Sequence, residues 1–285
     1  MLKRFVVVLA VFALFGSLTF AAEVLRADGS KEPAPAGKRI QGPATVRTAS
    51  GGRITIDEGG AVEILPPDGD IELIMVKRGA VRGIIDGKTQ VAGPNAWLMV
   101  RPGTWARFYA ETNGANKGFI KVTEGQALLV YGGNINVHLT AGNGINLAKT
   151  KSGGMWFGTH QTNVSDIRMI HRVTDTLEID LTVPKATSGS FRQELDGQKT
   201  RVTSDAISWK SGQISLETRL DGEKKHTGSL GPGTFAVIDN STGVLEISFS
   251  EADFQIVERA ASLTSELSAL AVSNFFGDEA PKSGN

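Results

Sequence analysis

The segment ATVRTASGGRITIDEGGAVEI, from Ala44 to Ile64, alternates apolar and polar residues and is interrupted by glycine-containing turns. Ile54 and Ile56 alternate with polar neighbours, and Val62 and Ile64 resume the alternation after a Gly-Gly pair. A period of two places successive side chains on opposite faces of a β-strand, whereas an amphipathic helix repeats every three to four residues. The segment is therefore predicted to form a β-hairpin.

The same pattern recurs along most of the chain, and the 34 glycines are scattered between the alternating segments. Glycine adopts positive φ without steric cost, so it marks tight turns. Short strands at regular spacing, with a turn signal between them, predict a mainly β protein with an antiparallel β-sandwich or jelly-roll-like domain. The predicted turns in the first half include Arg78-Gly79, Asp86-Gly87, Asn113-Gly114, Glu124-Gly125 and Gly132-Gly133.

The N-terminus has the features of a secretory signal peptide. Lys3 and Arg4 precede an uncharged apolar stretch from Phe5 to Phe15, and the small residues Ala21 and Ala22 follow. The apolar stretch is shorter than the roughly 20 residues of a membrane-spanning helix. We therefore predict cleavage near Ala21 or Ala22 and a periplasmic or secreted protein.

Composition narrows the possible functions of the exported chain. The full chain has a formal net charge of zero, which becomes slightly negative once Lys3 and Arg4 leave with the signal, and it has no cysteine. Without disulfides, burial and sheet hydrogen bonds must hold the fold together. Nucleic-acid binding is not predicted because the sequence has no basic patch. No later segment is long and apolar enough to be an integral membrane segment once the signal is removed.

The end of the chain changes from a strand period to a helix period. Apolar residues recur at three and four between Ser250 and Gly277, which predicts one C-terminal amphipathic helix that packs over a sheet face. These apolar residues are Ile256, Ala260, Leu263, Leu267 and Leu270. The predicted organisation is a signal peptide (1–22), an extended lead-in (23–43), a first β domain (44–150), a second β region (151–249), the helix (250–277) and a disordered tail (278–285).

The sequence predicts no catalytic residue, metal ligand or cofactor. The four histidines, His138, His160, His171 and His226, are far apart and lack a metal-binding spacing. No G-x-S-x-G nucleophile motif and no phosphate-binding glycine loop is present. The two carboxylates of a polysaccharide-cleaving enzyme are recognised by their distance in the folded protein and not by their spacing in the sequence. An enzyme of that kind therefore stays an alternative.

The candidate partner-binding residues are Met155, Trp156 and Phe157. They lie between glycines at a junction where the alternation is interrupted. Three bulky apolar residues in a flexible joint either plug a domain interface or bind a partner.

The segment from about Ala44 to Ala148 resembles the FecR-type domain. The resemblance rests on VRTASGGRITIDEGGAVEI, KRGAVRGII, PGTWARFYAE followed by GFIKVTEGQALLV, and HLTAGNGINLA, in that order. It implies a β-rich periplasmic module. The best-known members are inner-membrane regulators that pass signals from an outer-membrane receptor to a cytoplasmic sigma factor. Only Met1 to Arg4 precede the apolar stretch here, so the chain is similar to stand-alone exported members that lack the cytoplasmic anti-sigma region.

From these observations we expect a non-catalytic exported protein that binds a protein partner or an envelope component, with a role in signalling as one option. An exposed sheet edge that accepts a strand would provide the binding mode. Two alternatives stay open, namely a self-assembling structural protein of the cell envelope and a polysaccharide-active enzyme.

Overall fold

The computed structural model describes residues 22–93, 95–112, 117–150, 154–205 and 213–249. The protein is mainly β, and these residues form 22 strands and no helix. The predicted signal peptide, apart from Ala22, lies outside the described residues. The Asn113-Gly114 turn, the C-terminal helix and the tail lie outside them as well.

Two sheets make up the structure, and we call them sheet A and sheet B. Sheet A is entirely antiparallel. Its order is β2 (Lys31–Ala34), β1 (Ala22–Arg26), β4 (Ala44–Arg47), β5 (Arg53–Ile56), the second half of β7 (Ile71–Asp86), β10 (Trp105–Thr112), the first half of β11 (Lys117–Tyr131), β13 (Gly144–Lys149), β14 (Met155–Thr159), β17 (Gly189–Asp196), β18 (Lys199–Asp205), β21 (Thr234–Asp239) and β22 (Leu245–Phe249).

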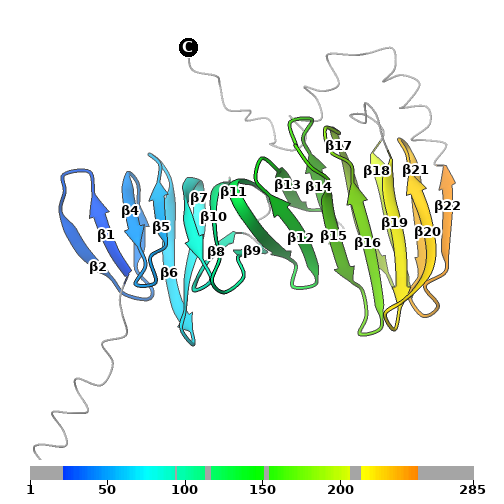
Figure 1. The fold of residues 1–285 in the computed structure, drawn as a ribbon, viewed down its shortest axis with the longest axis horizontal. Helices are drawn as coiled ribbons and strands as arrows, with labels where there is room; N and C mark the ends of the chain where they lie inside the picture. Colours follow the sequence, from blue (N-terminus) through cyan, green and yellow to red (C-terminus); the bar gives the residue numbers. More distant parts are fainter. Residues whose placement is uncertain (1–21, 94, 113–116, 151–153, 206–212, 250–285) are drawn as a thin grey trace, which may run out of the picture.

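Sheet B is antiparallel except for the parallel pair β7–β8. Its order is β3 (Arg39–Gln41), β6 (Ala61–Asp68), the first half of β7, β8 (Thr89–Gly93), β9 (Ala96–Met99), the second half of β11, β12 (Ile135–Thr140), β15 (Ile167–Arg172), β16 (Leu177–Val183), β19 (Ile214–Leu220) and β20 (Glu223–Leu230). The strands run across the long axis of an elongated molecule (Figure 1).

The second half of the chain adds hairpins to the two sheets in turn. The hairpin β13–β14 belongs to sheet A, β15–β16 to sheet B, β17–β18 to sheet A, β19–β20 to sheet B and β21–β22 to sheet A. The β13–β14 ladder crosses residue 150, where the sequence predicted the end of the first β domain. The buried apolar side chains of both halves also form one cluster, so the core is continuous across that point.

Two long strands join the sheets. β7 pairs in sheet B up to Arg78 and in sheet A from Gly79, and β11 pairs in sheet A up to Gly125 and in sheet B from Gln126. Gly79 has φ +71° and Gly125 has φ +77°. The prediction of chain-reversing turns at these two glycines is therefore wrong. Each glycine bends a continuous strand from one sheet into the other, and the predicted turn at Gly132-Gly133 is confirmed.

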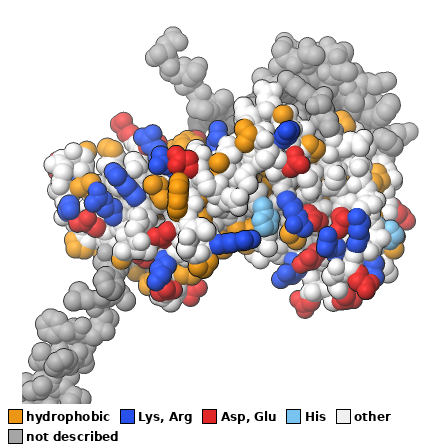
Figure 2. Space-filling view, in the orientation of Figure 1, with side chains coloured by type: hydrophobic (Ala, Val, Ile, Leu, Met, Phe, Trp, Pro, Cys, Tyr) orange, Lys and Arg blue, Asp and Glu red, His pale blue; other side chains and the backbone are white. Residues whose placement is uncertain are grey.

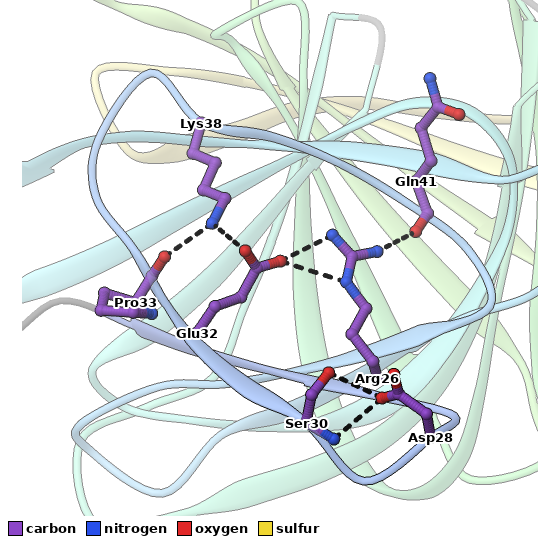
Figure 3. Close-up of polar contacts among 7 residues, drawn as sticks. All are labelled: Arg26, Asp28, Ser30, Glu32, Pro33, Lys38 and Gln41. Carbon is purple, nitrogen blue, oxygen red and sulfur yellow. Dashed lines mark hydrogen bonds and ion pairs between the residues drawn. The ribbon is translucent and has the colours of Figure 1, made fainter.

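Residues 23–43, where the sequence predicted an extended lead-in, form β1, β2 and β3. Val24, Ala34 and Ile40 are fully buried between the sheets, so a few apolar side chains suffice to hold these short strands. Ion pairs between side chains also link the segments at the N-terminal end (Figure 3). Glu32 accepts hydrogen bonds from Arg26 at 2.7 Å and pairs with Lys38 at 2.9 Å, which links sheet A to the segment that leads into β3.

Candidate interaction surfaces

Met155, Trp156 and Phe157 lie in β14, between β13 and β17, and not in a flexible joint. Strand alternation separates their side chains. Phe157 is fully buried and stacks on Phe191 with ring centroids 5.1 Å apart, and Met155 packs against the edge of the core. Trp156 points to the outer face, where its ring covers Gly158 so closely that a Cβ there would lie 2.4 Å from it. The three residues therefore do not form one surface.

The outer face of sheet B carries an apolar surface that the sequence analysis did not single out. We call it the apolar face, and it consists of half-buried side chains on three strands of sheet B. They alternate with fully buried residues such as Ile74, Leu98 and Leu129, which point into the core. The apolar face comprises Leu73 and Met75 on β7, Trp97 and Met99 on β9, and Leu128 and Val130 on β11.

Register places these side chains next to one another. Trp97 lies opposite Val130, and Met99 opposite Leu128. Ala92 of β8 connects the two groups, because it lies beside Met75 on one side and opposite Trp97 on the other. An antiparallel sheet with one solvated face normally alternates apolar and polar residues. The apolar face breaks that rule on adjacent strands of one sheet.

Polar or charged side chains lie on two sides of the apolar face. Glu63 lies opposite Met75 and pairs with Lys77 at 3.2 Å. On the other border His138 lies opposite Leu128. Leu65 of β6 lies opposite Leu73 and Gln90 of β8 lies beside it, so the patch contains one polar side chain and its border on β6 is apolar in part.

Charged side chains of both signs lie close together on the outer face of sheet B, over β15, β16, β19 and β20 (Figure 2). Asp180 lies opposite Glu217, and two like charges in that position are destabilising. Arg168 pairs with Asp180, and Lys224 pairs with Glu217 at 2.7 Å. The hydrogen bond from Lys224 is the main cause that lowers the pKa of Glu217. These exposed pairs balance one another, so we read this region as a solvated face.

The sheet edges differ in how they are protected. At the N-terminal end β2 contains Pro33, which has no N–H to donate, and β3 is only three residues long. At the C-terminal end β20 exposes Glu223, Lys224 and Lys225 in succession. Proline, shortness and charge are the devices that keep edge strands from pairing with other chains.

Among the described residues β22 is the edge strand of sheet A at the C-terminal end, and Glu246 is its only charged residue. Its sequence, LEISF, contains neither proline nor lysine. Ile247 is 40% exposed, and Val244, immediately before the strand, is 42% exposed. Ile247 also reaches across to β20, because a Cβ on Gly228 would lie 2.4 Å from its Cδ1. β22 is therefore an accessible strand with apolar side chains beside it.

The described residues offer no assembled metal centre. No group of three His, Asp or Glu side chains that could hold a metal occurs among them. A cavity of about 100 Å³ lies at the N-terminal end, with Glu72 as the one carboxylate in its lining. That carboxylate already accepts hydrogen bonds from the backbone of Ala49 and Ser50 at 3.1 and 3.2 Å. Within the described part, no helix is long and apolar enough to cross a membrane.

His171 and Gln193 are two of the polar side chains that are buried in the core. His171 of β15 is 1% exposed, and the amide nitrogen of Asn134 lies 3.0 Å from its Nε2. Gln193 of β17, on sheet A, is buried close to the same ring. Burial lowers the pKa of His171 to about 4, and the Gln193 amide opposes this only weakly. A neutral, enclosed imidazole of this kind is a structural residue, since solvent and ligands do not reach it.

Comparison of the sequence with models of known protein families finds no match, and comparison with curated proteins finds no relative.

Proposed function

We propose that this chain is a non-catalytic exported protein of the cell envelope that binds an extended segment of a protein partner along β22. The observation that carries the proposal is the contrast between β22 and the protected edges β2, β3 and β20. The resemblance of residues 44–148 to the FecR-type domain supports an envelope location and a link to signalling. Binding of an added strand requires backbone hydrogen bonds and no reactive side chain.

The backbone of β22 provides the hydrogen-bonding groups for such a partner. The N–H of Asp239 donates to the carbonyl of Val244 at 2.9 Å at the start of the β21–β22 ladder. In an antiparallel ladder, hydrogen-bonded pairs alternate with pairs that make no bonds to each other. Glu246 and Ser248 therefore bond to β21, and the backbone groups of Leu245 and Ile247 point to the free edge. An added strand would pair with these groups and contact Val244 and Ile247.

Ile247→Pro is expected to weaken partner binding about tenfold or more, because proline removes an outward N–H and its ring obstructs the added strand. The measurement is a cross-linked pull-down of the tagged mature protein from its native envelope. Ile247→Ala is the matched control, since it shortens the same side chain and keeps the N–H. Equal recovery with the proline and alanine variants would rule out strand addition at this position.

The same edge favours one alternative, the self-assembling structural protein. Two copies related by a twofold axis would pair β22 with β22 in antiparallel fashion and extend sheet A across the interface. Because Pro33 protects the edge at the other end, this route leads to a dimer and not to a long polymer. Light scattering that shows large, concentration-dependent species would instead favour assembly through another surface.

A further inference from the structure

We propose that the chain is cleaved between Ala21 and Ala22, and that the new amino terminus binds in the cavity at the N-terminal end, beside the carboxylate of Glu72. The inference deepens the proposed function, because it rests on export of the chain and adds a processing step that completes one end of the fold. It does not depend on strand addition at β22.

The structure distinguishes between the two cleavage positions that the sequence allows. Ala22 is already part of β1, where it lies opposite Ala34 of β2, and it is 5% exposed in the uncleaved chain. Cleavage after Ala22 would remove this residue from the sheet, whereas cleavage after Ala21 leaves β1 complete. Small residues are also needed before the cleaved bond. Thr19 and Ala21 are the third and first residues before the Ala21–Ala22 bond, whereas a cut after Ala22 would put the bulky Phe20 third.

Cleavage creates a charge at the edge of an apolar cavity. Hydrolysis of the Ala21–Ala22 bond by a signal peptidase consumes one water molecule and leaves a carboxylate on Ala21 and an ammonium group on Ala22. Ala22 lines the cavity of about 100 Å³, whose lining is mostly alanine, proline, leucine and isoleucine. Removing an ammonium group from water is costly unless an anion or other acceptors lie beside it. An amino terminus at this place therefore needs a partner in the cavity.

Glu72 of β7 is the partner that the geometry offers. It is the only titratable residue among the described residues that line the cavity. Continuing the β1–β4 register by one residue places Ala22 opposite Thr48. The N–H of Ala49, the residue after Thr48, donates to Glu72 Oε1 at 3.1 Å. Since paired strands lie about 5 Å apart, the carboxylate is held roughly one strand spacing from the amino end of β1.

The carboxylate is fixed in place and still has capacity to accept a hydrogen bond. Ser50 donates to Oε2 of Glu72 from its backbone N–H and from its hydroxyl, both at 3.2 Å. Oε1 accepts the bond from Ala49. Because each carboxylate oxygen can accept about two hydrogen bonds, Oε1 can take a further donor. An ammonium group supplies that donor together with the opposite charge, so the bond would be a charge-assisted one.

Two other carboxylates at this end of the molecule have cationic partners of their own. Glu23 pairs with Lys31 at 3.6 Å, and Glu32 pairs with Lys38 at 2.9 Å (Figure 3). Strand alternation also puts the side chain of Glu23 on the opposite face of sheet A from Ala22, which faces the core. Glu72 is therefore better placed than Glu23 to receive the amino terminus.

The intact mass of the protein purified from its native source tests the cleavage position. We expect a chain that begins at Ala22. A chain that begins at Glu23 would overturn the inference and leave export of the protein, as the proposed function requires it, unaffected. A chain that retains residues 1–21 would contradict both.

The reactivity of the amino terminus tests its binding beside Glu72. A free α-amino group has a pKa of about 7.7 to 8.0, and a neighbouring carboxylate raises the pKa. At pH 8 the paired group is mostly ammonium, which an acylating reagent does not attack. In the protein that begins at Ala22, we expect acylation of the amino terminus, measured by peptide mass, to be about fivefold slower than in Glu72→Gln, as a rise of about one pH unit in the pKa predicts. Glu23→Gln is the matched control and should react like the wild type.

A chain with one additional glycine before Ala22 keeps the test valid if Glu72→Gln disturbs the fold. The glycine moves the amino group by about 3.4 Å along the strand and leaves the carboxylate unchanged. This chain should also react about fivefold faster than the wild type. Equal rates in the wild type, Glu72→Gln and the extended chain would mean that the amino terminus lies in solvent, which would overturn the binding step. A faster reaction in Glu23→Gln alone would assign the amino terminus to Glu23 and contradict the proposal.

Discussion

Gly125→Ala is expected to lower the free energy of unfolding by about 2 to 5 kcal/mol, which is enough to threaten folding of a typical domain. Gly125 has φ +77°, a conformation that costs a residue with a Cβ roughly 1 to 2 kcal/mol. A Cβ at this position would also lie 2.5 Å from the carbonyl oxygen of Trp105. Because that oxygen belongs to the paired strand β10, the clash adds about 1 to 3 kcal/mol of backbone displacement.

Gly133→Ala provides the matched control for this prediction. Gly133 has φ +83°, but nothing lies within 4 Å of the position that its Cβ would occupy. The loss should therefore be about 1 to 2 kcal/mol, the conformational cost alone. Urea denaturation of both variants measures the difference. If the two substitutions cost the same, the close contact between β10 and the bend in β11 does not contribute to stability.

These two glycines also show how far the sequence could predict the fold. The alternation and the glycine signals correctly indicate strands, and Gly132-Gly133 does reverse the chain between β11 and β12. Glu124-Gly125 has an equally strong turn signal and a positive φ, yet the strand continues. The local sequence indicates only that the backbone bends at these glycines. Whether the bend leads back along the same strand or into the other sheet depends on pairing with β10, β12 and β13, which are distant in the sequence.

The candidate surfaces were harder to predict for the same reason. The sequence groups Met155, Trp156 and Phe157 because they are adjacent, but pairing of β14 with β17 puts Phe157 in the core and Trp156 outside. The sequence does not show that β22 is an edge strand. The strand lies at an edge because successive hairpins join the two sheets alternately, and this order is not visible in the sequence. The apolar face did leave a signal, namely continuous apolar runs where a solvated sheet would alternate.

His171 is expected to make the protein lose stability as the pH falls from about 6.5 to 4. An unfolded histidine has a pKa of about 6.5, whereas burial lowers the pKa of His171 to about 4 in the folded protein. The folded-state pKa is depressed, so the unfolded chain binds the proton first, and each step down in pH within this window favours unfolding. The full effect corresponds to about 3 kcal/mol at 1.36 kcal/mol for each pH unit between the two pKa values.

His171→Gln tests this assignment, because glutamine keeps a polar side chain near Asn134 and Gln193 but does not titrate. At pH 7 the variant should be less stable than the wild type by about 1 to 2 kcal/mol, the cost of an imperfectly replaced buried hydrogen bond. The wild type loses a similar amount by about pH 5 to 5.5, where the two denaturation curves should coincide, and below that pH the variant should be the more stable protein.

This reversal, in which the variant becomes more stable than the wild type at low pH, distinguishes His171 from the other groups that titrate in acid. Asp239, whose pKa is lowered to about 2 chiefly by hydrogen bonds from Ser241, loses its contribution at still lower pH, equally in both proteins. His226→Gln, a substitution at an exposed position on β20, serves as the control and should leave the order of stabilities unchanged. If His171→Gln and the wild type lose stability in parallel from pH 7 to pH 4, the imidazole takes up its proton as readily in the folded protein as in the unfolded chain. The core would then have to accommodate a cation at a position where the His171 side chain is almost fully buried, which the cost of burying a charge opposes.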